Sequence, residues 1–270
     1  MDIAAIEALR ELNNAFYREH AASFSATRAS AWEGWRRCAE LIGPYASAGS
    51  PSVLDVACGN LRFEEFLSAE LPDARIAFHA VDSCEALLPR AAVGGEGKPL
   101  RAAVDFRELD VIEAALAAGP DGGALLPAGL PQCDATVCFG FMHHVPSRGL
   151  RERIVKGLVR ATHPGGVVVV SLWRFMECGS FADKARREHA RSLQALREAG
   201  SAVSAECLEE GDMLLGWQNA PGAVRYCHSF SDAEVDGLAA CVSREAKPVA
   251  RYLADGKTRD MNAYLALRVL

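Results

Sequence analysis

The first fifty residues carry apolar side chains at helical spacing. Apolar positions recur through residues 3–16 with charged residues between them, which predicts a helix over about residues 2–21. Ser30–Glu33 has the spacing of a capping box, and the apolar positions over 32–42 predict a second helix behind it. The Gly43-Pro44 pair is expected to end that helix.

Short apolar runs alternate with helical patterns from residue 52 onward. The runs lie at about 53–57, 76–81, 101–106, 134–139 and 167–173. Strand and helix patterns in alternation predict an α/β fold with a mostly parallel sheet and helices on both faces. Two further runs, 249–253 and 264–269, predict a pair of strands joined across Asp255-Gly256.

One region interrupts this alternation, and the whole chain is expected to form a single domain of 270 residues. Residues 1–50 would form N-terminal helices and 51–173 a ligand-binding core. Residues 174–230 would be an insertion on the substrate side, with a charged helix over about 181–199 and a looser stretch around Trp217. Residues 231–270 would add a C-terminal helix and the last strands.

Composition and charge exclude several classes of protein. No apolar run approaches the roughly 20 residues of a membrane helix, and early charges such as Asp2 and Glu7 argue against a signal peptide, so we expect a cytoplasmic protein. The net charge of −6 argues against DNA binding and against non-specific coating of nucleic acid. Nine cysteines without Cys-x-x-Cys spacing predict buried thiols, with no metal site and no disulfide framework.

The first strand run ends in Cys58-Gly59-Asn60, a glycine turn that lets a ligand approach the backbone. Neither a GxGxxG nor a Walker A pattern follows it, so a pyrophosphate-binding loop is not supported. Acids occur instead: Asp55 lies in the first strand, Asp82 ends the second, and Asp110 follows the third. A carboxylate after the second strand suits a ribose diol, and a pocket rich in acids suits a cationic nucleoside such as S-adenosylmethionine.

These segments, VLDVACGN, VDSCEALL, LDV, CDATVCFGFMHHV and HPGGVVVVSLW, resemble the ordered motifs of class I S-adenosylmethionine-dependent methyltransferases over about residues 52–173. The resemblance implies a Rossmann-like, seven-stranded sheet whose last strand is antiparallel. The chain departs from the family motif at one position, where Leu61 stands in place of the usual second glycine of the loop. It implies that Asp82 holds the ribose, that Asp110 and Val111 flank the adenine, and that Asp55 anchors the loop near the amino group. The implied cofactor-binding residues are Asp55, Ala57, Cys58, Gly59, Asn60, Asp82, Ser83, Asp110, Val111 and Phe139.

Two histidines follow the fourth strand, where a substrate would lie. His143 and His144 are candidate catalytic residues because an imidazole can act as base or hydrogen-bond donor near neutral pH. The alternative is that one of them caps the next helix or packs against the sheet.

Segments on both sides of the core extend the resemblance. SFSATRASAW at 23–32 and GDMLLGWQ with RYCHSFSDAEV at 211–235 are similar to the eukaryotic tRNA methyltransferases that esterify 5-carboxymethyluridine at the wobble position. That family implies a pocket with Arg28 in a catalytic role and a small zinc-binding activator protein as partner. It implies the substrate-binding residues Trp217, Arg225, Tyr226 and His228. The alternatives are a surface ion pair for Arg28 and hydrophobic packing for Trp217 and Tyr226.

Three functions remain open on the sequence. The first is methyl transfer to a carboxylate of modified tRNA, and the second is methylation of a small anionic metabolite. The third is a non-catalytic S-adenosylmethionine-binding or interaction protein. An RNA-binding surface would use basic residues of two helices, which otherwise form solvated faces: Arg148, Arg151, Arg153, Lys156 and Arg160, and Lys184, Arg186, Arg187, Arg191 and Arg197.

Overall fold

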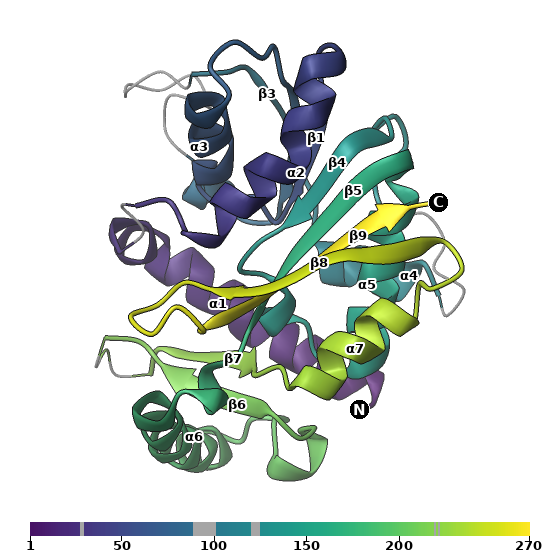
Figure 1. Ribbon diagram of the computed structural model, residues 1–270. Coiled ribbons are helices and arrows are strands. Elements are labelled where there is room, and N and C mark those ends of the chain that lie inside the picture. Colours follow the sequence, from purple (N-terminus) through teal and green to yellow (C-terminus); the bar gives the residue numbers. More distant parts are fainter. Residues whose placement is uncertain (28–29, 89–100, 120–124, 219, 221) are drawn as a thin grey trace.

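The structure, a computed structural model, describes residues 1–270 except 28–29, 89–100, 120–124, 219 and 221, and centres on a seven-stranded sheet (Figure 1). The strand order is β3-β2-β1-β4-β5-β9-β8. The strands are β1 (Ser52–Val56), β2 (Ala77–Asp82), β3 (Val104–Glu108), β4 (Cys133–Cys138), β5 (Thr162–Trp173), β8 (Ala246–Ala254) and β9 (Asn262–Val269). Strands β1 to β5 are parallel, and β9 pairs antiparallel with β5 and β8. The predicted Rossmann-like fold with an antiparallel last strand is confirmed.

Successive residues of the buried strands contribute to two core layers, one on each face of the sheet. Val53 and Leu54, adjacent in β1, lie in different layers, as the period of two in a strand requires. One layer joins the sheet to α4 (Val111–Ala117), α5 (Arg148–Arg160) and α7 (Asp232–Ala240), and the other joins it to α2 (Gly34–Ala48) and α3 (Arg62–Glu70). Because both faces are covered, the middle of β5 is a continuous apolar run: residues 167–170 are all valine and fully buried.

A second group of elements lies at one side of this sheet. The helix α1 (Ile3–Ala26) packs on β7 (Val224–His228), which forms a hairpin with β6 (Asp212–Gly216), and α6 (Gly179–Glu198) packs on β6. In Figure 1, α1 in purple passes between the main sheet and this hairpin. The charged helix predicted in the insertion is confirmed as α6. The hairpin replaces the loose stretch that we expected around Trp217.

The second helix differs from its prediction at both ends. It begins at Gly34 after Glu33, whose side chain makes no capping bond, so the expected capping box does not form. It also continues through Gly43 and Pro44 to Ala48. A proline inside a helix removes one backbone hydrogen bond. Here the last turn is held from outside, because the Tyr45 hydroxyl donates to the Gly165 carbonyl at 2.6 Å.

The long helices are amphipathic. The 24 residues of α1 bury a stripe that includes Ile6, Leu9 and Phe16, and the 20 residues of α6 bury Ala182 and Ala185. Both helices keep charged residues on their other faces, as expected for helices that lie on a core. Over the described residues, no helix has the length and hydropathy to cross a bilayer.

Candidate functional site

A cavity of about 980 Å³ opens where the carboxyl ends of β1, β2 and β4 meet α1. Ligand sites for small molecules span roughly 300–1,000 Å³, so the cavity can hold two small reactants or one large one. The turn between β8 and β9 closes part of its rim through residues 255–256 and 261–262. The ten residues predicted to bind the cofactor all line it: Asp55, Ala57, Cys58, Gly59, Asn60, Asp82, Ser83, Asp110, Val111 and Phe139.

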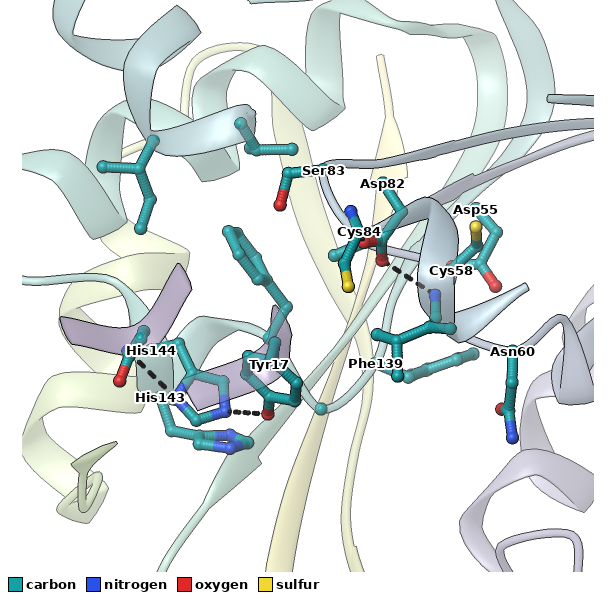
Figure 2. Close-up of a pocket in the computed structure, with 18 of the residues that line it drawn as sticks. Tyr17, Asp55, Cys58, Asn60, Asp82, Ser83, Cys84, Phe139, His143 and His144 are labelled. Carbon is teal, nitrogen blue, oxygen red and sulfur yellow. Dashed lines mark hydrogen bonds between the residues drawn. The ribbon is translucent and has the colours of Figure 1, made fainter. Parts of the chain in front are cut away.

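The glycine turn after β1 is tied to the end of β2 by one carboxylate. Asp82 accepts the Gly59 N–H at 2.8 Å with one oxygen and the Cys84 N–H at 2.8 Å with the other (Figure 2). Gly59 has a φ of +56°, a conformation that favours glycine, and its missing Cβ would meet no atom within 4 Å. The backbone at Gly59 is therefore open to the cavity, and Asp82 is oriented before any ligand arrives.

Leu61, which replaces the usual second glycine, does not occupy the cavity. Its backbone has a φ of +57°, and its side chain is fully buried against Cys58, Ala80 and Leu88. The leucine thus accepts an unfavourable backbone conformation and fills a small core below the loop. The loop can approach a ligand despite the substitution.

Asp110 connects the third strand-end loop to α1. One of its oxygens caps α4 by accepting the Ile112 and Glu113 N–H groups. Its other oxygen accepts hydrogen bonds from Arg10 at 2.6 Å and from Asn14 at 3.2 Å. The helix α1 is thereby clamped over the end of the cavity where the resemblance places an adenine.

The chemistry of these groups fits S-adenosylmethionine. Carboxylates can accept hydrogen bonds from ribose hydroxyls and can balance a positive charge, and Asp55 and Asp82 are both buried at the cavity wall. Asp55 Oδ1 is itself buried and accepts no hydrogen bond from the described residues. The main-chain turn at Gly59 offers the close backbone approach.

His144 is held in one tautomer. Its Nδ1 lies 2.9 Å from the Tyr226 carbonyl oxygen, which can only accept, so Nδ1 carries a hydrogen. Its Nε2 lies 2.7 Å from the Tyr17 hydroxyl and, in the neutral ring, accepts that proton (Figure 2). Asn13 fixes the backbone on both sides of the Tyr226 Cα, because it accepts the Tyr226 N–H at 2.8 Å and donates to the Tyr226 carbonyl at 3.2 Å. Tyr17 and His144 therefore form a proton-holding pair at the cavity wall.

The sequence did not single out Tyr17, although it carried a signal. Arg10, Asn13, Asn14 and Tyr17 follow the spacing of one helix face, and all four line the cavity. A polar stripe of this spacing next to the buried apolar stripe of the helix indicates a face turned towards a polar site.

His143 also lines the cavity, as expected for a candidate catalytic residue, and is 9% exposed. Its ring centre is 4.1 Å from that of His144 and 5.0 Å from that of Trp173. Nitrogens of both histidines and the Cys227 sulfur lie within 4.8 Å of one another, a spacing that a metal ion could use. That set fits a metal poorly, because both nitrogens of His144 are hydrogen-bonded and burial raises the pKa of the Cys227 thiol to about 11.

Arg225 brings a buried cation to the cavity. It is 7% exposed, and its guanidinium lies over the rings of Trp217 at 5.0 Å, Phe16 at 5.5 Å and Trp173 at 5.9 Å. No described acidic side chain pairs with it, and its Nε has no hydrogen-bond partner among the described residues. Aromatic faces offset part of the cost of burying this charge, and an anion in the cavity would offset the rest.

The other residues predicted to bind substrate lie behind this wall. Trp217 backs Arg225 and donates from its indole N–H to Ser23 at 3.1 Å, which fits the packing alternative. Tyr226 and His228 are fully buried away from the cavity, contrary to our expectation, and both bond Asp212 at 2.7 Å. Side chains alternate along a strand, so Arg225 and Tyr226 of β7 cannot face the same side.

An ionic network surrounds these two side chains. Arg151, 2% exposed, pairs with Glu209 at 2.8 Å, and His228 bonds Glu234 at 2.8 Å. Burial alone would lower the pKa of His228, but the hydrogen bonds to Asp212 and Glu234 outweigh it and raise that pKa. Arg151 thus belongs to the interior and drops out of the predicted RNA-binding surface. Arg28 lies outside the described residues, and its role stays a prediction from the sequence.

Comparison with known proteins agrees with this architecture. No protein-family model matches the chain. A putative methyltransferase of Encephalitozoon cuniculi is 29% identical over 216 residues, which cover 80% of this chain and 78% of that protein. The chain therefore shares most of its length with a protein named as a methyltransferase.

Solved methyltransferase structures share the fold at low sequence identity. The DhpI–SAM–HEP complex is 19% identical with a TM-score of 0.57, and covers 97% of this chain and 98% of its own. The N-methyltransferase NodS of Bradyrhizobium japonicum, bound to S-adenosyl-L-homocysteine, is 12% identical with a TM-score of 0.53 and the same coverage. A S-adenosylmethionine-dependent methyltransferase of Methanosarcina mazei is 14% identical with a TM-score of 0.55, and covers 82% of this chain and 93% of its own.

The fold is thus shared with solved S-adenosylmethionine-dependent methyltransferases, and most of the chain is similar in sequence to a protein named as a putative methyltransferase.

Proposed function

We propose that this protein is an S-adenosylmethionine-dependent methyltransferase that acts on an anionic acceptor, a carboxylate, which Arg225 binds. The observation that carries the proposal is the buried guanidinium of Arg225, which faces the cavity without a described acidic partner. A guanidinium can bind a carboxylate through two parallel hydrogen bonds, which fixes its orientation as well as its position.

Each end of the cavity has its own part in the reaction. S-adenosylmethionine supplies an electrophilic methyl group on a sulfonium. Asp82 and the backbone at Gly59 offer contacts for the cofactor, while Arg225 orients the acceptor oxygen and the aromatic side chains around it exclude water. An ionised carboxylate needs no base, so catalysis consists mainly of positioning and of charge complementarity.

As the acceptor we propose the carboxyl group of 5-carboxymethyluridine at the wobble position of tRNA. Support comes from the sequence resemblance at 23–32 and 211–235 and from Arg225 within the second of these segments. On α6 the basic side chains are exposed and could contact phosphates: Lys184, Arg186, Arg187, Arg191 and Arg197. A small activator protein is part of this proposal as a partner.

The test is a comparison of tRNA nucleosides, by mass spectrometry, from cells with and without the gene. We expect the methyl ester of carboxymethyluridine to disappear without the gene and the free acid to accumulate. The purified protein, with labelled S-adenosylmethionine, should then label tRNA that carries the free acid, and Arg225→Ala should abolish the label while S-adenosylhomocysteine still binds. Unchanged nucleosides together with unlabelled tRNA would contradict the proposal.

A small anionic metabolite with a hydroxyl or amine nucleophile is the second candidate acceptor. The Tyr17–His144 pair favours it, because such a nucleophile must lose a proton that this pair could take. Labelling of a nuclease-treated metabolite extract by the purified protein would support this candidate. If neither tRNA nor metabolites are labelled and calorimetry detects no cofactor binding, a non-catalytic role is favoured.

A further inference from the structure

Two carboxyl groups lie buried below the glycine turn. Asp55 in β1 is 3% exposed and Glu64 in α3 is 2% exposed. Asp55 lines the cavity, in which Figure 2 shows it beside Cys58 and Asp82, whereas Glu64 does not line it. Asp55 Oδ1 and both Glu64 oxygens accept no hydrogen bond from any described donor. Two buried carboxylates without donors are unfavourable, so this pair requires a proton or a cation.

The surroundings of the pair supply little positive charge. Asp82, on β2, adds a third acid. Arg62 on α3 opposes this but donates to the Ser30 carbonyl and to Asn60, and it lies over the ring of Trp35. Burial keeps three neighbouring thiols protonated by raising their pKa values, so they add no charge: Cys38 on α2, Cys58 in the turn and Cys138 on β4.

Without a bound cation, burial favours the protonated form of the pair. Burial and the neighbouring Glu64 raise the pKa of Asp55 well above its usual range, and burial raises the pKa of Glu64 to about 7. A hydrogen bond between the two carboxyl groups forms only when one of them is protonated.

We propose that Glu64 makes this pair a proton-exchange site: the ammonium group that the resemblance places near Asp55 replaces, on arrival, the proton that the two carboxyl groups share. The inference rests on the proposed function, because the amino-acid end of S-adenosylmethionine supplies this ammonium. The exchange balances: one cation enters the site, one proton leaves to solvent, and no covalent bond of the cofactor changes. Asp55 meets the ammonium from the cavity wall. Glu64 is a positioning residue that acts through Asp55 by holding the proton while the site is without its cation.

Calorimetry on the full chain tests the exchange without an acceptor. S-adenosylhomocysteine carries the ammonium, and 5′-methylthioadenosine carries the same nucleoside without it. In buffers of different ionisation enthalpy at pH 6–7, we expect S-adenosylhomocysteine to release up to one proton and methylthioadenosine to release none. The Kd of S-adenosylhomocysteine should fall by up to about tenfold per pH unit between pH 5.5 and 7, since binding is linked to one proton.

The variant Glu64→Gln tests whether Glu64 links ligand binding to proton release or only stabilises the fold. A glutamine amide can donate to Asp55 and keep it ionised, so proton release and the pH dependence of the Kd should both disappear. Glu70→Gln, at the exposed end of the same helix, is the matched control and should behave as the wild type. Equal proton release with both ligands, or S-adenosylhomocysteine binding without release, would overturn the inference and leave the proposed function standing. Failure to bind S-adenosylhomocysteine at all would overturn both.

Discussion

The two ends of the cavity that we propose for the cofactor (the cofactor end) and for the acceptor (the acceptor end) are built in different ways. The cofactor end uses loops that directly follow parallel strands, so Asp55, Gly59 and Asp82 meet within about 30 residues of chain. The acceptor end joins Tyr17, His144 and Arg225, which come from α1, from the segment after β4 and from β7. Local geometry assembles the first end, and tertiary packing assembles the second. We therefore expect substitutions to separate the two ends cleanly.

Arg225→Ala should give the largest effect and affect the acceptor end alone. Truncation of one partner of a buried charge pair costs about 2–5 kcal/mol, so kcat/KM for the acceptor should fall by at least about 30-fold. The Kd of S-adenosylhomocysteine should stay within about twofold, since Arg225 touches no residue of the glycine turn in the described contacts. Arg225→Lys should recover only part of the activity, because lysine lacks the planar fork. A large loss of cofactor affinity in Arg225→Ala would break the separation of the two ends.

Asp82→Asn should give the next largest effect, at the cofactor end. The amide cannot accept the Gly59 and Cys84 N–H groups with both of its polar atoms, and it carries no charge. Charge-assisted hydrogen bonds contribute about 1.5–3 kcal/mol, so calorimetry should show S-adenosylhomocysteine binding weakened about 10- to 100-fold. The KM for the acceptor at saturating cofactor should not change. Asp73→Asn, at an exposed position after α3 and outside the cavity lining, is the matched control and should bind like the wild type.

Tyr17→Phe tests whether the Tyr17–His144 pair at the acceptor end takes a proton from the acceptor during the reaction. For a carboxylate acceptor we expect kcat within about threefold of wild type, because no proton leaves the nucleophile. For a hydroxyl or amine acceptor, loss of the relay should lower kcat about 100-fold or more. A pH–rate profile of both proteins is the measurement. A flat profile that Tyr17→Phe leaves unchanged supports the carboxylate, and a base-limited profile that it abolishes supports the metabolite.

The smallest effect that we expect is on the stability of the fold, through the ionic network around His228 behind the acceptor end. The pKa of His228 is raised in the folded protein, so its stabilising contribution is complete below the unfolded pKa of about 6.5 and is lost as the pH rises through the folded value. Urea unfolding of the wild type should therefore show a free energy of unfolding that declines above pH 6.5, by about 1.4 kcal/mol per unit of pKa shift. His228→Gln should flatten this decline.

Glu64 also makes the free energy of unfolding decline as the pH rises, since its pKa is raised in the folded protein. The chains with His228 and with His228→Gln should therefore be compared with Glu64→Gln present in both. An identical slope with and without His228 would contradict the role of the network.

The same contrast explains what the sequence could predict. The sheet follows from apolar runs, which are local signals, and the ten residues of the cofactor end follow from the family resemblance of the strand-end motifs. The orientation of Tyr226 and His228 was mistaken because the pattern around Trp217 did not identify β7, and without a strand there is no alternation to apply. Tyr17 was missed because its partner, His144, lies 127 residues away. The continuation of α2 past Pro44 likewise depends on a distant contact, with Gly165.

The hydrogen on Nδ1 of His144 does not depend on which side chain stands at position 226. The group that fixes its position is the main-chain carbonyl of Tyr226, and a carbonyl is present whatever residue stands there. Side-chain scanning at position 226 would report the stability of the network and leave the imidazole tautomer unchanged. The tautomer of His144 is thus set by the path of the backbone. It can persist through sequence drift that erases every recognisable side chain of the hairpin.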